Sequence, residues 1–290
     1  MQPKPVALIT GASSGMGAAA AKQFLHAGYT VYAGARHVDK MADLAALGIH
    51  TCHLDVTDGA SNQAFVDQVL AETGRIDVLI NNAGYGSFGA LEDVSSVEAK
   101  RQFDVNVFGA MNLTQLVLPT MRQQHYGKII NNSSIGGQIY GTLGGWYFAS
   151  KHALEALSDT LRLEVADFGI DVIIIEPGGT NTNWGAIAAD NLLKVTPLDS
   201  PYRTAAESFG MLSGAGFSRS PEDLDYLMWK TTTIAHPKSR YQASFGDKLA
   251  VVAARKLSYR MYDRLAKFAT KATARHNAAK TATEGHLTNN

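Results

Sequence analysis

The sequence has little cysteine and no long apolar run, and these absences exclude several classes of protein. Cys52 is the single cysteine among 290 residues, which excludes an internal disulfide framework and suits a reducing cytosol. No uninterrupted apolar stretch of about 18 residues is present, so we expect no membrane-spanning helix. Residues 1–5 lack the basic-then-apolar pattern of a signal peptide. We therefore expect a cytoplasmic protein.

The charged and metal-binding side chains indicate no special partner. Lys plus Arg and Asp plus Glu number 26 each, which gives a net charge of zero. Such a balance gives no reason to expect a nucleic acid or a membrane surface as a partner. The nine histidines show no paired ligand spacing, so we expect no metal site.

Short β-branched or apolar runs alternate with long amphipathic stretches through the first 180 residues. A continuously apolar run such as 172–175 is typical of a strand buried on both faces. The alternation predicts an α/β fold: a Rossmann-type, doubly wound parallel sheet of about seven strands with helices on both faces, in a single domain over 1–270. The runs are Val6–Thr10, Thr30–Ala35, His50–Leu54, Asp77–Asn81, Lys128–Asn132 and Asp171–Glu176.

The alternation stops after residue 179. Residues 181–220 mix Gly, Ser and Pro with scattered large apolar groups, a composition that favours an irregular substrate lid. A helix is expected from the Ser220 cap to about Ala235, then a last strand over 240–244. An amphipathic helix rich in Lys and Arg is expected over 249–268, followed by a polar tail over 271–290.

A glycine-rich turn directly follows the first predicted strand and precedes an alanine-rich helix. Its glycines have the spacing Gly-x-x-x-Gly-x-Gly. They allow a tight turn and close approach of a pyrophosphate, while the helix N-terminus offers free N–H groups and the positive end of its dipole. A merely structural turn is the alternative. The residues expected to contact the cofactor here are Gly11, Ser13, Ser14, Gly15, Met16 and Gly17.

The end of the second predicted strand bears on the choice of cofactor. An acidic residue there would accept a hydrogen bond from the ribose 2′-hydroxyl of NAD. Here the strand ends at Ala35 and is followed by Arg36, whose guanidinium suits a 2′-phosphate. The pattern therefore favours NADP, with a solvated loop charge as the alternative.

Two further strand ends carry candidate cofactor contacts. Asp55 and Val56 follow the third strand, where the carboxylate could accept from the adenine amino group or could simply cap a turn or helix. Asn82, Ala83 and Gly84 follow the fourth strand. They could let the cofactor lie close to the sheet edge, or could form a plain turn.

Tyr147 and Lys151 lie four residues apart at the start of a predicted helix over 146–168. Residues at i and i+4 share a helix face, so the phenol and the ammonium point the same way. Because a nearby ammonium favours the phenolate, we expect a lowered pKa that suits Tyr147 to acid–base catalysis. Alone, such a pair is more often a chance occurrence.

Two other polar residues make the pair more significant. Ser134 follows the fifth strand, thirteen residues before Tyr147, where a hydroxyl could hold a substrate oxygen. Ser133 and Ser134 would point to opposite sides of a continuing strand, so only one can serve. Asn106 lies within a predicted helix, where it could contact a water beside Lys151 or simply satisfy a helix kink.

Taken together in this order, the motifs resemble those of the short-chain dehydrogenase/reductases over about residues 5–180, down to Pro177 and Gly178. The resemblance implies that Tyr147 is the general acid/base and that Lys151 lowers its pKa and holds the nicotinamide ribose. It selects Ser134 over Ser133 as the residue that orients the carbonyl, and it implies that Asn106 supports a proton relay through water.

The resemblance also extends to the cofactor and to one branch of the family. It implies nicotinamide contacts through Pro177, Gly178, Thr180 or Thr182, an NADP preference, and hydride transfer from the B face of the ring. The stretches at 84–89 and 154–159 look most like the retinol- and hydroxysteroid-dehydrogenase-like branch.

The expected substrate is a small-molecule carbonyl or alcohol, bulky and apolar, of the steroid, retinoid or aryl ketone type. Its pocket is expected between the segment 135–143, residue 85 and the lid. About half of the aromatic side chains in these segments could instead belong to the core of the lid. The candidate substrate residues are Tyr85, Ile135, Tyr140, Trp184 and Met211.

Two alternative functions and the oligomeric state remain open. A non-catalytic NADP-binding regulator or scaffold would be favoured by a missing catalytic residue, and none is missing. A membrane-associated reductase would use the cations of 249–268 against anionic lipid, although packing on the protein itself is the more frequent use of such a helix. The resemblance suggests a homodimer or homotetramer with helices around 100–122 and 150–168 at the interface.

Overall fold

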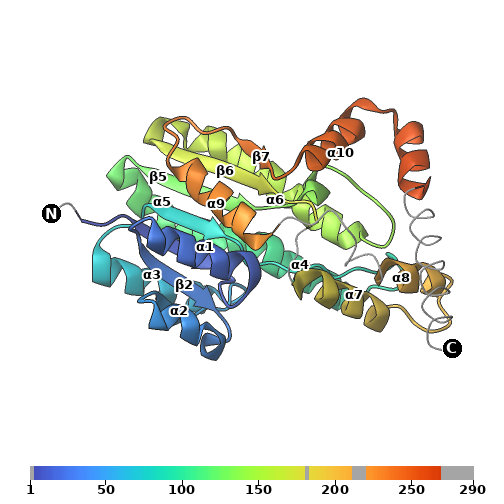
Figure 1. Ribbon diagram of the computed structural model, residues 1–290, viewed down its shortest axis with the longest axis horizontal. Coiled ribbons are helices and arrows are strands. Elements are labelled where there is room, and N and C mark those ends of the chain that lie inside the picture. Colours follow the sequence, from blue (N-terminus) through green and yellow to red (C-terminus); the bar gives the residue numbers. More distant parts are fainter. Residues whose placement is uncertain (1–2, 180–182, 211–219, 269–290) are drawn as a thin grey trace, which may run out of the picture.

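A computed structural model describes residues 3–179, 183–210 and 220–268, and its centre is a seven-stranded sheet. The strand order is β3-β2-β1-β4-β5-β6-β7, and every neighbouring pair is parallel. This topology confirms the predicted doubly wound fold (Figure 1). The strands are β1 Val6–Thr10, β2 Thr30–Ala35, β3 His50–His53, β4 Val78–Asn81, β5 Gly127–Asn132, β6 Ile170–Glu176 and β7 Arg240–Gln242.

Alternate side chains of the strands enter two separate cores. Leu8 of β1 packs with Phe65 and Leu113 on one face, whereas Ile9 packs with Phe24 and Met228 on the other. Because both faces are covered, the central strands contain continuous apolar runs such as 6–9, 78–80 and 172–175, as the sequence pattern indicated. Helices α3 Gly59–Thr73, α5 Ala110–Gln124 and α6 Gly145–Glu164 cover the first face; α1 Gly15–His26, α2 Ala42–Ala46 and α9 Pro221–Thr232 cover the second (Figure 1).

The remaining helices lie beyond the carboxyl ends of the strands. These are α4 Ser96–Phe103, α7 Asn183–Val195, α8 Arg203–Gly210 and α10 Phe245–Lys256 (Figure 1). A six-residue π-helical segment, Asp104–Gly109, joins α4 to α5 without a break. Ligands of open parallel sheets bind at this edge, so the fold places the candidate site there.

Three helical expectations need correction. The segment 181–220, expected to be irregular, contains α7 and α8 in its described part. The single helix expected over 249–268 is two segments: a capping box of Ser244 and Asp247 starts α10 at Phe245, and extended backbone at Leu257 (φ −76°, ψ 147°) separates it from helical residues 259–268. The helix expected to reach Phe168 ends at Glu164 and continues as a 3₁₀ turn over Ala166–Phe168.

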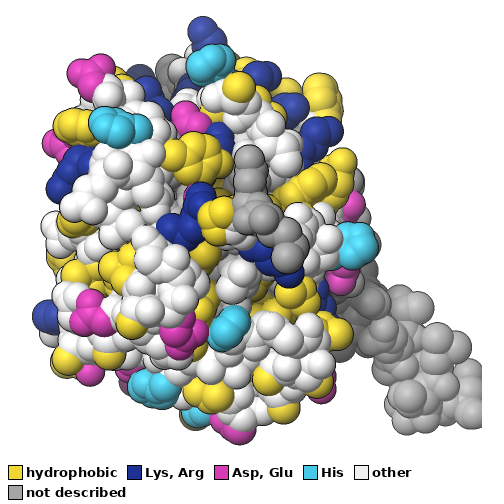
Figure 2. Space-filling model, turned by 90° about the vertical axis from the view of Figure 1, so that its left-hand side faces the viewer, with side chains coloured by type: hydrophobic (Ala, Val, Ile, Leu, Met, Phe, Trp, Pro, Cys, Tyr) yellow, Lys and Arg dark blue, Asp and Glu magenta, His cyan; other side chains and the backbone are white. Residues whose placement is uncertain are grey.

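The described surface carries both signs of charge. Basic and acidic side chains are interspersed with apolar ones over the face shown in Figure 2, and neither sign covers it. This distribution fits the balanced composition. In the part of the chain that the structure describes, no helix combines the length and the hydrophobicity needed to cross a bilayer.

Candidate active site

The glycine-rich turn after β1 is shaped for close approach of a ligand. Gly11 and Gly15 have left-handed backbones (φ +67° and +56°), a conformation that glycine adopts at little cost. A Cβ on Gly17 would lie 2.4 Å from the carbonyl oxygen of Gly11, so the helix start fits against the turn only with glycine. The N-cap Ser14 makes no capping hydrogen bond through its side chain, which leaves first-turn N–H groups of α1 available to an anion.

Asn82 supports this turn from the end of β4. Its backbone N–H donates to Thr10 Oγ1 (3.0 Å), and its Nδ2 donates to the carbonyl oxygens of Thr10 (3.0 Å) and Gly11 (3.3 Å). Its Oδ1 accepts from Asn132 Nδ2 at 2.9 Å. The stretch after β4 therefore does more than turn the chain: it fixes the glycine-rich turn to the sheet edge.

Arg36 and Asp55 follow β2 and β3, which are neighbours in the sheet. Arg36 is exposed and forms no hydrogen bond with the described residues. Asp55 Oδ1 accepts from the backbone N (3.0 Å) and Oγ1 (2.8 Å) of Thr57, so the turn-capping alternative for Asp55 is present. Burial acts to raise the pKa of Asp55, but these hydrogen bonds and the charge of Arg36 hold it below its usual value. Val56 is buried against Gly109 of the π-helical segment.

Asn106 lies in the π-helical segment and links two parts of the site. Its Oδ1 accepts from the backbone N of Tyr85 (3.0 Å), while its Nδ2 donates to the carbonyl oxygen of Tyr85 (2.9 Å) and to Ser150 Oγ (3.1 Å). Ser150 Oγ in turn donates to the carbonyl oxygen of Tyr147 (2.8 Å). Such π-helical turns are frequent at functional sites. Here the segment turns a buried amide toward the start of α6.

The structure brings Ser134 and Tyr147 into hydrogen-bonding contact. Ser134 caps the 3₁₀ turn Ile135–Gly137: its Oγ accepts from the backbone N of Gly136 (3.0 Å), and its single proton can be donated to the carbonyl oxygen of Pro177 (3.2 Å) or to the phenolic oxygen. Ser133 is buried elsewhere, and its Oγ has no hydrogen-bond partner among the described residues. Ser134, not Ser133, therefore lies at the phenol.

The electrostatics of the pair differ from the sequence expectation. Burial raises the pKa of Tyr147 to about 12, and the hydrogen bond with Ser134 opposes this rise. The expected lowering is therefore wrong for this structure, because desolvation dominates at the buried phenol. The Lys151 Nζ donates to the carbonyl oxygen of Asn132 (2.8 Å). Burial also lowers the pKa of Lys151 to about 8, against the opposing charge of Glu155.

An apolar cluster surrounds the ring of Tyr147 on the side of α7 and α8. The ring of Phe88 lies 5.2 Å from it, centroid to centroid. Leu143 has a left-handed backbone (φ +61°), and its carbonyl oxygen accepts from the backbone N of Gly89 at 2.7 Å. The cluster comprises Phe88, Ala90, Leu143, Tyr147, Ala188, Leu192 and Ala206.

The remaining predicted substrate and cofactor residues have varied surroundings in the structure. The Tyr85 hydroxyl donates to Glu98 of α4 (3.1 Å), so its phenol is directed at a helix. Tyr140 is 40% exposed and donates to Asp263. Ile135 is half-buried at the start of its 3₁₀ turn. Pro177 is buried and Gly178 lies beside Asp247, whereas Thr180, Thr182, Met211 and the side chain of Trp184 are outside the described residues.

Sequence reasoning anticipated the segment 135–143 and the lid as neighbours of the site but missed Phe88. Phe88 lies in the stretch 84–89, which as a whole was noted only for its likeness to one branch of the family. No periodicity marks Phe88, because its stretch is neither strand nor helix. The available signal was its place shortly after a strand's carboxyl end, where pocket walls form.

Comparison with known proteins agrees with this geometry. The profile of the short chain dehydrogenase family matches residues 5–191. The chain is 41% identical over 204 residues to a probable short-chain type dehydrogenase/reductase, VdlC, of Helicobacter pylori. The matched region covers 70% of this chain and 75% of the relative. It is 43% identical over 184 residues to a 3-ketodihydrosphingosine reductase of Bacteroides thetaiotaomicron. This match covers 63% of this chain and 66% of the relative.

Solved structures show the same fold. A short-chain dehydrogenase from Streptomyces avermitilis superposes with a TM-score of 0.78 at 32% identity, over 93% of this chain and 99% of that one. Similar structures include complexes with a 5-hydroxy-NADP and with NAD, so the fold alone indicates a nicotinamide cofactor without selecting one. The chain belongs to the short-chain dehydrogenase family of oxidoreductases.

Proposed function

We propose that the protein is an NADP(H)-dependent oxidoreductase that interconverts a ketone or aldehyde and an alcohol. The observation that carries the proposal is the Ser134–Tyr147 hydrogen bond at the carboxyl edge of the sheet, with Lys151 one helical turn further along. A non-catalytic scaffold would have no need of this constellation. No member of the set Asn106, Ser134, Tyr147 and Lys151 is missing.

The residues of the site have complementary roles in the proposed reaction. Tyr147, protonated at neutral pH because its pKa is raised, donates the phenolic proton to the carbonyl oxygen, and Ser134 holds that oxygen by a hydrogen bond. Lys151 carries positive charge that stabilises the phenolate left behind. The side chain of Asn106 is engaged by Tyr85 and Ser150, so a proton relay through water would use its backbone.

The residues present fit a nicotinamide dinucleotide. The cradle at Gly11 and Gly17, which a Cβ would fill, and the uncapped start of α1 suit the pyrophosphate. Arg36, exposed beside Asp55, suits the 2′-phosphate of NADP, and Asp55 retains Oδ2 for the adenine amino group. When bound, NADPH supplies the hydride.

A bulky apolar substrate is supported by the cluster around Tyr147. Phe88, Leu143 and Leu192 place apolar walls on one side of the phenol, and an apolar wall favours an apolar carbonyl compound. The name of the Bacteroides thetaiotaomicron relative, a 3-ketodihydrosphingosine reductase, also describes a ketone reductase. The resemblance to the retinol- and hydroxysteroid-dehydrogenase-like branch points the same way.

A panel of ketones and alcohols with NADPH and NADH side by side tests the proposal. Tyr147→Phe should lower the kcat for ketone reduction by about 10²- to 10⁴-fold, the range of general acid catalysis. Tyr226→Phe is the matched control, since Tyr226 is exposed on α9, and it should change kcat less than about twofold. Full activity in Tyr147→Phe would exclude the mechanism.

A membrane-associated reductase is the second candidate, and one observation favours it. Exposed apolar side chains accompany cations on α10 and on the helical residues 259–268, a combination suited to an anionic lipid surface. Pelleting with anionic and neutral vesicles tests this candidate; recovery of all protein in the supernatant would remove it. The exposed apolar residues are Phe245, Leu249, Val252, Tyr259, Met261, Leu265 and Phe268.

We also propose a homodimer or homotetramer. Val97, Phe108 and Leu163 are 77%, 61% and 71% exposed on α4, the π-helical segment and α6. These are the helices expected at the interface, and large exposed apolar side chains often mark a contact surface.

A further inference from the structure

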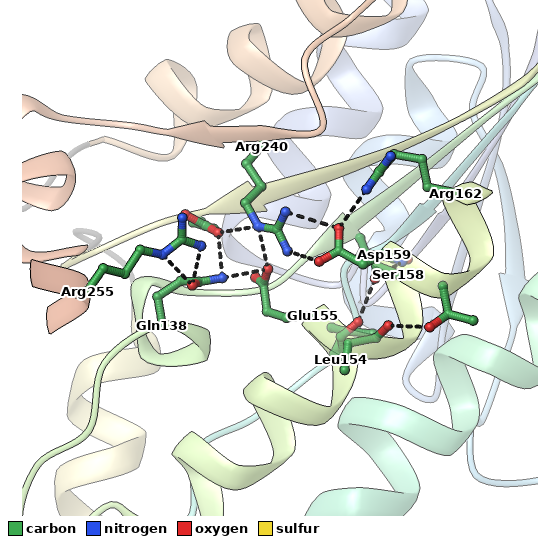
Figure 3. Close-up of polar contacts among 12 residues, drawn as sticks. Gln138, Leu154, Glu155, Ser158, Asp159, Arg162, Arg240 and Arg255 are labelled. Atoms are coloured by element: carbon green, nitrogen blue, oxygen red, sulfur yellow. Dashed lines mark hydrogen bonds and ion pairs between the residues drawn. The ribbon is translucent and has the colours of Figure 1, made fainter. Parts of the chain in front are cut away.

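A buried polar cluster joins the catalytic helix to the far edge of the sheet (Figure 3). Arg240 of β7 lies at its centre. Its Nε donates to Glu155 Oε2 (3.0 Å) and lies 3.1 Å from Glu176 Oε1, while its Nη1 and Nη2 donate to the two carboxylate oxygens of Asp159 (3.0 and 2.5 Å). One guanidinium thus holds two carboxylates of α6 and one of β6.

Glutamine side chains enclose the two carboxylates that are most deeply buried. Gln138 Nε2 donates to Glu155 Oε2 (3.0 Å) and to Glu176 Oε1 (3.2 Å), and Gln242 donates to Glu176 Oε2. Glu155 is 4% exposed and Glu176 is fully buried. Two carboxylates in such surroundings repel each other. Arg240, which contacts both, offsets this repulsion together with the charge of Arg255.

Glu155 is also placed to act on the catalytic lysine. Lys151 and Glu155 are i and i+4 on α6, so their side chains share one face, and both are buried. Lys151 Nζ donates to the carbonyl oxygen of Asn132, and no salt bridge joins it to Glu155. Glu155 Oε1 has no hydrogen-bond partner among the described residues. No direct hydrogen bond therefore screens the negative charge at this oxygen from the neighbouring groups.

We propose that Glu155 is a positioning residue that keeps the Lys151 ammonium charged inside a desolvated site, and that Arg240 holds Glu155 in place for this role. The inference rests on the proposed function, which assigns Lys151 to the reaction. Burial lowers the pKa of Lys151 to about 8, and the charge of Glu155 opposes that fall. Without Glu155, burial acts alone and the ammonium loses its proton at lower pH.

Tyr147 lies one helical turn before Lys151 on α6, and other ionisable groups are linked to Glu155 directly or through Arg240 and Gln138, so that their charges are part of the balance. Asp159 and Arg162 belong to α6, Glu176 to β6, Arg240 to β7 and Arg255 to α10, where it donates to Gln138 Oε1 (2.6 Å). Glu155 is the group whose charge raises the Lys151 pKa. A neutral isostere at 155 isolates its contribution.

The experiment is an NMR titration of the full chain carrying ¹³C-labelled lysine. The Lys151 ε-carbon signal is identified as the one absent from Lys151→Arg. Glu155→Gln should move its titration midpoint to lower pH by about one pH unit. The matched control is Glu164→Gln, which removes a carboxylate from the exposed end of the same helix and should leave the midpoint in place. A midpoint in Glu155→Gln that is unchanged or higher overturns the proposal.

A second variant keeps the test decisive if Glu155→Gln does not fold. A Cβ on Gly137 would lie 2.7 Å from Glu155 Cγ, so Gly137→Ala must displace the Glu155 side chain without removing its charge. We expect the Lys151 midpoint to move in this variant, because the Glu155 charge changes its distance from the ammonium, and an unchanged midpoint contradicts the proposal.

A kinetic measurement separates this inference from the proposed function. In Glu155→Gln, the loss of ketone reduction at alkaline pH should begin about one pH unit earlier than in the unmodified protein. An identical pH profile counts against the positioning role. If the unmodified protein reduces no ketone in the panel, the proposed function fails, while the NMR titration still decides whether Glu155 sets the charge of Lys151.

Discussion

Replacing Arg240 by methionine removes the single guanidinium shared by Glu155, Asp159 and Glu176 while keeping an apolar stem of similar length. The Arg240 side chain is 19% exposed, whereas those of Glu155 and Glu176 are 5% and 0% exposed. Removing one partner of a buried ion pair costs about 3–5 kcal/mol, because the other partner is left charged and unpaired. The outer pair with Asp159, whose side chain is 38% exposed, contributes less than about 1 kcal/mol of this.

The loss of stability should depend on pH with a definite sign. Burial and the charge of Glu155 already raise the pKa of Glu176, and removing Arg240 raises it further. A carboxyl whose pKa is higher in the folded than in the unfolded state binds its proton more tightly when folded. The free energy of unfolding therefore falls as the pH rises from the unfolded pKa of about 4.3 through the folded pKa. We therefore expect a larger loss at pH 7.5 than at pH 5.

Urea unfolding at pH 7.5 and pH 5 measures this loss. At pH 7.5 we expect Arg240→Met to lower the free energy of unfolding by about 3 kcal/mol and the melting temperature by about 8 °C. Arg162→Met is the control, since Arg162 bonds Asp159 at 3.2 Å with 39% of its side chain exposed, and it should lose less than about 1 kcal/mol. Equal losses in the two variants, or a loss that grows toward pH 5, would refute the reasoning.

Three further changes test the cofactor site and the assembly. Arg36→Ala should reduce the preference for NADPH over NADH in kcat/KM by about 10- to 100-fold, because a charge-assisted contact is lost. Lys40→Ala should leave this preference unchanged. The same preference in Arg36→Ala as in the unmodified protein would exclude the phosphate role of Arg36. Gly17→Ala should destabilise by about 1–3 kcal/mol, since its Cβ would lie 2.4 Å from a backbone oxygen, while Gly59→Ala, with no atom within 4 Å, should be neutral or stabilising in thermal unfolding. Leu163→Asp should shift the species seen by analytical ultracentrifugation toward monomer; an unchanged distribution would place the interface elsewhere.

Much of the fold could be predicted because parallel strands buried on both faces leave a strong local signal. The apolar run of β6 and the glycine-rich turn after β1 are each contained in a few consecutive residues. Such elements depend on short-range pattern and on the parallel topology. The residues alone left Ser133 and Ser134 open; the family resemblance selected Ser134, and the structure brings Ser134 into contact with Tyr147.

What the sequence could not predict depends on distant contacts. Arg240 meets Glu155 across 85 residues, and nothing in the neighbourhood of either residue indicates the other. The direction of the Tyr147 pKa depends on how deeply the ring is buried by Phe88 and the lid helices, which periodicity does not reveal. The interruption at Leu257 has no proline or glycine to mark it, so the amphipathic pattern alone predicted a continuous helix.

The π-helical segment Asp104–Gly109 has a consequence for changes in chain length. Both of its ends are anchored: Ser95 caps α4 on one side, and Leu113 and Val117 fix α5 against the sheet on the other. Deleting one residue from the segment would turn one anchored helix about 100° relative to the other, which would either take Asn106 away from Tyr85 or expose an apolar face. We therefore expect this stretch to accept substitutions at its exposed positions but no insertion or deletion, so that its length is as much a part of the site as its asparagine.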